Sequence, residues 1–174
     1  MGLFFEVLSA INNPNQQASV DQLSSITNTV QQLAASRGIE PSTMQTVLSG
    51  LGSALRPAMQ QQARGGGSLE NLMGQLTGAS GGLGALSSFL PPQMQQQLVQ
   101  GIAQKTGISA GTLEGMLPTL IPVVMNLLKM GNSTSGGGIG DNPLLRTFLD
   151  SDNDQDVDLG DVFKFANRFL TPAR

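Results

Sequence analysis

A pattern of apolar and small residues occurs twice in this chain, at an offset of 69 residues that pairs Val30 with Val99 and Gly38 with Gly107. Self-similarity at a fixed spacing is typical of repeated structural units. We therefore expect two copies of one unit, at about residues 20–62 and 89–130. The eleven positions that match without a gap are Val30/Val99, Leu33/Ile102, Ala34/Ala103, Gly38/Gly107, Ile39/Ile108, Thr43/Thr112, Met44/Leu113, Val47/Met116, Leu48/Leu117, Leu51/Leu120 and Leu55/Val124.

Each copy predicts a helical hairpin. Apolar residues recur every three or four positions on both sides of a Gly-Ile pair, and a glycine directly after a helix commonly adopts the left-handed cap conformation. Glu40 and Ser109 are placed to begin the second helix of each copy. Neither hairpin can bury its apolar face alone, so we expect the two to pack into one all-α helical bundle. Pro118 and Pro122 should kink the last helix or divide it in two.

Composition restricts the chemistry that this chain can perform. Apolar residues make up 39% of it and aromatic residues 4%, with no Trp, Tyr, Cys or His. The absence of Cys and His removes thiol nucleophiles, imidazole bases, disulfides and the usual zinc ligands. We therefore do not expect an enzyme. Residues 1–130 carry five acids and five bases, and the remainder seven acids and four bases, which argues against a phosphate-binding surface.

The two ends of the first 130 residues give no strong membrane signal. Residues 2–11 predict a short amphipathic helix that is terminated by Asn12-Asn13-Pro14 and docks on the body. Its polar face lacks the Lys and Arg of a membrane anchor. The apolar stretch 117–130 is too short and too interrupted to span a bilayer. The start of the chain has no basic region of a signal peptide, so a cytoplasmic location is expected.

Glycine-rich stretches divide the chain. Residues 65–88 predict a flexible connector with a short helix over 68–76, and residues 131–141 predict a linker. The expected organisation is a helical domain over 1–130, the linker, and a separate module over 142–174. In that module Asn142 should cap a helix that begins at Pro143.

The module carries half of the acids in the chain, six of twelve, between Asp150 and Asp161. Five of them occupy positions 1, 3, 5, 9 and 12 of a twelve-residue segment, with Val157 at position 8. A calcium ion requires six to eight oxygens, and alternate residues of a curling loop supply them. Close carboxylates repel one another unless a cation neutralises them. We therefore predict a Ca²⁺ site whose candidate residues are Asp150, Asp152, Asp154, Asp156, Asp158 and Asp161, with Asp156 contributing its backbone carbonyl.

This segment resembles an EF-hand, and with the following helix it is similar to the half-motif of dockerin modules. The resemblance covers Leu149 to Leu170. Two departures weaken the site: Gln155 stands where the motif has Gly for its turn, and Asp161 stands where a longer Glu binds with both oxygens. The expected dissociation constant is on the order of micromolar to millimolar.

Two stretches of the first 130 residues carry a second resemblance: the opening Met1-Gly2-Leu3-Phe4-x-Glu6-Val7, and the second hairpin, Gly107-Ile108-Ser109-Ala110-Gly111-Thr112-Leu113 to Leu117-Pro118-Thr119-Leu120-Ile121-Pro122. These stretches give residues 1–130 a resemblance to the YidB-like bacterial family of unknown function. It implies a small cytoplasmic helical protein with no established activity.

Two functions compete. The first is a non-enzymatic calcium-binding protein, in which the apolar face of the last helix meets the body, a protein partner or a second copy of the chain. The alternative is a helix-turn-helix-like nucleic-acid-binding protein, because the two copies share the packing residues of such a unit. Nucleic acid is the less favoured partner, since the DNA-contacting faces around Ser42, Gln45, Thr46 and Ser49, or Gly111, Glu114 and Gly115, carry no basic residue.

Overall fold

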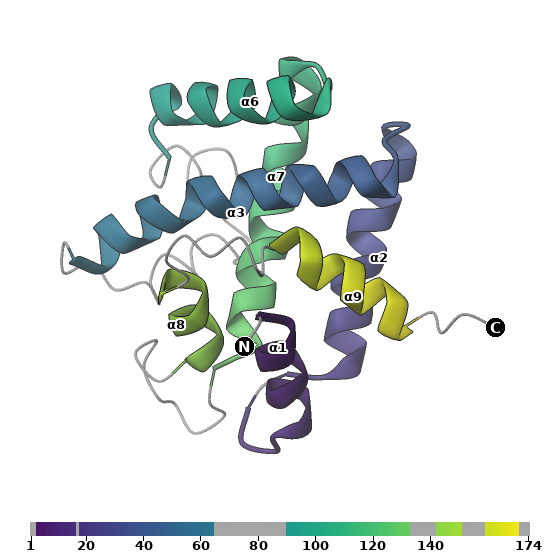
Figure 1. Cartoon of the computed structure of the whole chain (residues 1–174), viewed down its shortest axis with the longest axis vertical. Helices are drawn as coiled ribbons and strands as arrows, with labels where there is room; N and C mark the ends of the chain where they lie inside the picture. The colour runs from purple at the N-terminus through teal and green to yellow at the C-terminus, as the bar shows by residue number, and fades with distance from the viewer. Residues whose placement is uncertain (1–2, 17, 65–89, 133–141, 151–158, 171–174) are drawn as a thin grey trace.

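The computed structural model describes residues 3–16, 18–64, 90–132, 142–150 and 159–170. In these ranges the chain forms helices and no strand, so the all-α prediction is confirmed (Figure 1). The predicted connector over 65–88, with its short helix, and most of the predicted linker lie outside the described residues. The helices are α1 (Leu3–Asn12), α2 (Val20–Ser36), α3 (Pro41–Arg64), α6 (Pro92–Thr106), α7 (Ala110–Lys129), α8 (Pro143–Asp150) and α9 (Leu159–Leu170).

The repeat corresponds to two helical hairpins, α2–α3 and α6–α7. Both turn glycines have a left-handed backbone, with φ of 64° at Gly38 and 73° at Gly107. Ser109 caps α7 by accepting a hydrogen bond from the Thr112 amide at 3.3 Å. The first helix of each copy packs against the second helix of the other, α2 on α7 and α3 on α6. The predicted bundle of two repeated hairpins is confirmed, and its two halves interlock.

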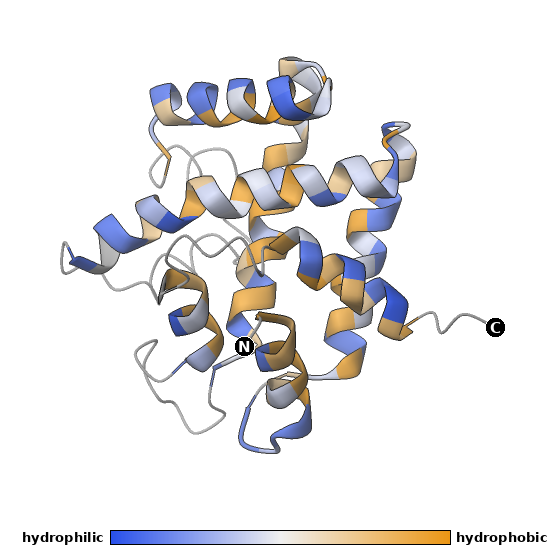
Figure 2. Cartoon of the chain, in the orientation of Figure 1, coloured by the Kyte–Doolittle hydropathy of each residue, from blue (hydrophilic) through white to orange (hydrophobic). Residues whose placement is uncertain are grey.

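Helix α7 is the centre of the core (Figure 1). Ten of its residues are buried, whereas α6 buries three, and Figure 2 shows the corresponding difference between the mostly hydrophobic α7 and the mostly hydrophilic α6. Pro118 and Pro122 lie inside one continuous helix. By length and composition alone α7 is long and apolar enough to cross a membrane, and 56% of its most apolar window is buried inside this fold.

Helices α1, α8 and α9 close the bundle on the side opposite α6 (Figure 1). Helix α1 docks through the buried Leu3, Val7 and Ala10 and contacts both α8 and α9. The docking predicted for the first helix is confirmed. One hydrophobic cluster contains side chains from both repeat copies and from these three helices. The division of the chain into a domain over 1–130 and a module over 142–174 remains a prediction from composition.

Candidate functional site

Helices α8 and α9 bracket the acidic segment in the order that a helix-loop-helix calcium site requires. Helix α8 ends at Asp150, the first position of the predicted loop, and α9 begins at Leu159, the tenth. Asp161, the twelfth position, lies in the first turn of α9 and is half-buried. The side chain of Asp150 and the remaining predicted ligands lie outside the described residues: Asp152, Asp154, Asp156 and Asp158.

The described ranges alone contain no group of three or more acids that could hold a metal ion. Of the predicted ligands, they place only the Asp161 side chain. The structure therefore shows where the acidic segment begins and ends, and its coordination remains a prediction. What the described residues do show is how both ends are held.

The start of α9 is held against α3 at a glycine. A Cβ atom at Gly160 would lie 2.5 Å from the carbonyl oxygen of Gln45 and would also collide with the hydroxyl of Ser49. Only a residue without a side chain permits this approach. This contact was not predicted from the sequence. A glycine inside a helix lowers the stability of the helix. Its presence in the first turn of α9 is therefore a signal of close packing that the sequence offered.

The end of α8 is held by the same helix. The side-chain amide of Gln60 donates a hydrogen bond to the carbonyl oxygen of Leu149 at 2.9 Å. The guanidinium of Arg56 lies over the Phe148 ring, 5.4 Å from its centroid, which adds a cation–π attraction. Both ends of the acidic segment thus rest on α3.

The start of α8 is fixed by a buried asparagine. The Asn142 side chain accepts a hydrogen bond from the Leu145 amide at 3.0 Å, which confirms the predicted cap. Its amide nitrogen donates to the Leu128 carbonyl at 2.8 Å and to Asn132 at 2.9 Å. Asn142 therefore connects the end of α7 to the beginning of α8.

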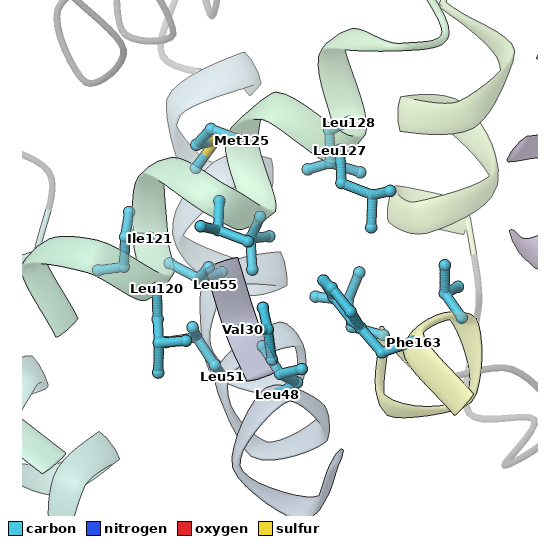
Figure 3. Packing of buried hydrophobic residues seen from close by; sticks show 14 of the residues in the cluster. Val30, Leu48, Leu51, Leu55, Leu120, Ile121, Met125, Leu127, Leu128 and Phe163 are labelled. Carbon is cyan, nitrogen blue, oxygen red and sulfur yellow. The ribbon is translucent and has the colours of Figure 1, made fainter. Parts of the chain in front are cut away.

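The apolar face of α9 divides into two parts. Val162, Phe163 and Ala166 are buried in the body, and Figure 3 shows Phe163 pointing into the core near side chains of α2, α3 and α7. Phe165 and Phe169 remain 43% and 51% exposed. The Phe165 ring lies 5.3 Å from that of Phe4 on α1, so the exposed aromatic surface extends across two helices.

Helix α9 also bears on the nucleic-acid alternative. Gln45 and Ser49, two of the four residues of the candidate DNA-contacting face in the first copy, lie against Gly160. The corresponding face of the second copy, around Gly111, Glu114 and Gly115, is exposed and carries an acid. Helix α9 therefore covers part of the candidate face of the first copy, and the guanidinium of Arg37 lies beside Gly115 in the second.

Comparison with known proteins identifies the family. The model of a family described as "Bacterial protein of unknown function (DUF937)" matches the chain twice, over residues 21–93 and 88–163. The chain belongs to the DUF937 family. No curated protein and no solved structure matches it.

The two DUF937 matches begin near the starts of the two helical hairpins, so the repeat seen in the sequence is a repeat of the family unit. The expectation of a helical bacterial family of unknown function is confirmed at this level. The second match continues through α8 and the acidic segment to residue 163 in α9. Because the description of the DUF937 family names no ligand, it leaves the metal site untested.

Proposed function

We propose that this protein is a non-enzymatic calcium-binding protein whose acidic segment, Asp150 to Asp161, holds one Ca²⁺. The observation that carries the proposal is the match between the ligand spacing and the helix ends, with α8 ending at position 1 and α9 beginning at position 10. We also propose that this segment is related to EF-hand and dockerin loops. Residues 1–130 are proposed to be related to the YidB-like family.

Anchoring on α3 supports the proposal physically. A loop that must be ordered on binding loses conformational entropy, which lowers its affinity. Here Gln60 holds the carbonyl of Leu149 at one end, and the close contact of Gly160 holds the other. These contacts reduce the conformational entropy that the segment loses when it binds calcium. This reduction offsets part of the decrease in calcium affinity expected from Gln155 and Asp161.

Isothermal titration calorimetry tests the site directly. Wild type should bind one calcium ion with a dissociation constant on the order of micromolar to millimolar. Asp150→Ala and Asp154→Ala should each weaken binding at least tenfold, because each removes a carboxylate ligand. Asp21→Ala, which removes an exposed acid on α2, is the matched control and should bind as wild type does. Absence of binding by a folded wild-type protein contradicts the proposal.

The exposed aromatic residues supply a surface for a protein partner or a second copy of the chain. Phe5, Phe165 and Phe169 are 65%, 43% and 51% exposed, and exposed apolar patches on soluble proteins commonly mark interaction sites. Light scattering in calcium and in EDTA measures self-association. Self-association would give a measured mass above that of the single 18.1 kDa chain. In a Phe165→Ser, Phe169→Ser double variant the measured mass should fall towards that of the single chain. A monomer in both buffers rules out self-association through this surface.

A further inference from the structure

The first hairpin and α9 form a pocket, partly open to solvent, that the calcium site does not use. Its volume is about 350 Å³, and its walls come from α2, α3 and α9. Val30, Ala34, Met44 and Leu48 line it from the hairpin, and Phe163 lines it from α9. Pockets of this size with mostly apolar walls are typical of small-molecule sites.

The polar groups of the pocket are few and uncharged. Gln31 on α2 donates a hydrogen bond to Asn167 on α9 at 2.8 Å, and both residues are part of the lining. None of the described residues that line the pocket carries a charge. An ionic group entering it would lose its hydration without gaining a counter-charge, whereas a hydroxyl group can hydrogen-bond to an amide.

We propose that this pocket binds an uncharged, hydrophobic small molecule that has one hydrogen-bonding group. A cavity of roughly 150 Å³ accommodates one benzene molecule, and the pocket volume of about 350 Å³ exceeds that. The hydrocarbon part lies against the accessible apolar lining, which includes Ala35 and Ile39, and the hydroxyl or carbonyl group lies at Gln31 and Asn167. This binding activity goes beyond calcium binding, because the lining residues come from the first hairpin and α9 and lie outside the acidic segment.

Two ligands that differ in charge test the proposal. The uncharged dye N-phenyl-1-naphthylamine reports occupancy by its fluorescence, and 1-octanol and octanoate compete with it. Wild type should bind the dye saturably, and octanol should displace it at a concentration at least tenfold lower than octanoate does. Equal potency of the two competitors, or dye binding that does not saturate, overturns the proposal.

The repeat supplies a matched control. Ala34 lines the pocket, and its equivalent Ala103 packs against the core without lining the pocket. Ala34→Met should fill the space and weaken dye and octanol binding at least tenfold, and Ala103→Met should not. If Ala34→Met unfolds, Ala35→Phe places the same obstruction at an exposed lining position. Unchanged binding in the folded pocket variant overturns the proposal.

Two further measurements separate this site from the others. Phe169→Ser, which removes an exposed ring outside the pocket lining, should bind the dye as wild type does; a loss of binding there assigns the dye to the exposed aromatic surface and overturns the proposal. The titrations are made in EDTA as well as in calcium. Dye binding in EDTA with no heat from calcium supports the pocket while rejecting the metal site.

Discussion

At the scale of single residues, the contact between α9 and α3 depends on the missing side chain of Gly160. Gly160→Ala would place a methyl group 2.5 Å from the Gln45 carbonyl, so α9 must shift. Overpacking of this kind costs about 1–3 kcal/mol. We expect a decrease of that size in the free energy of unfolding, measured by urea denaturation, and weaker calcium binding if the metal site is present.

The control for this variant is another helical glycine. Gly101 in α6 is exposed, and a Cβ atom there meets nothing within 4 Å. Gly101→Ala should therefore raise the free energy of unfolding by about 0.5–1 kcal/mol, because alanine loses less conformational entropy than glycine when a helix forms. Equal urea midpoints for the two variants would show that α9 does not rest on α3 as described.

Residues whose role is local could be predicted from the sequence, and residues whose role is tertiary could not. The positive φ of Gly38 and Gly107 and the caps at Ser109 and Asn142 follow from rules that involve a few neighbouring residues. The contact of Gly160 joins segments more than one hundred residues apart in the chain, and no local pattern specifies such a pair. The same limit applies to the site: carboxylate spacing predicts its ligands, whereas its anchoring on α3 required the structure.

At the scale of helices, Asn142 at the start of α8 should contribute more to stability than an ordinary helix cap does. Its side chain is fully buried and makes three hydrogen bonds. Asn142→Ala removes the cap and leaves the buried Leu145 amide without its acceptor, while the Leu128 carbonyl keeps only the bond from the Gly131 amide at 3.4 Å. We expect a loss of about 2–4 kcal/mol in the free energy of unfolding, measured by urea denaturation.

Ser19 is the comparison for this helix cap. It caps α2 at an exposed site, where its hydroxyl accepts one hydrogen bond from the Gln22 amide at 3.1 Å. Since water can replace that bond, Ser19→Ala should cost only about 1 kcal/mol. A loss for Asn142→Ala no larger than that for Ser19→Ala would mean that the connection between α7 and α8 adds nothing beyond the cap.

At the scale of the whole molecule, the fold is more continuous than composition suggests. Glycine-rich stretches predict separable parts, yet α8 and α9 contribute Leu144, Phe148, Val162 and Phe163 to the same hydrophobic cluster as both repeats. Local composition indicates which stretches favour linkers. It does not indicate which apolar helix faces pack against one another. The partner predicted for the apolar face of α9 is, for its buried half, the body of the same chain.

This continuity leads to a prediction about the two proposed sites together. Helix α9 carries Asp161 at its start and contributes Phe163 and Asn167 to the wall of the pocket. Calcium that holds the start of α9 should stabilise this wall and so raise the affinity for octanol, by about fivefold, the lower end of typical coupling between sites. By linkage, octanol must then raise the affinity for calcium by the same factor. Dye-displacement and calorimetric titrations, each with the other ligand present and absent, measure the two factors. Equal octanol affinities in calcium and in EDTA would instead mean that the packing of Val162, Phe163 and Ala166 alone holds α9 in place, with the two sites independent.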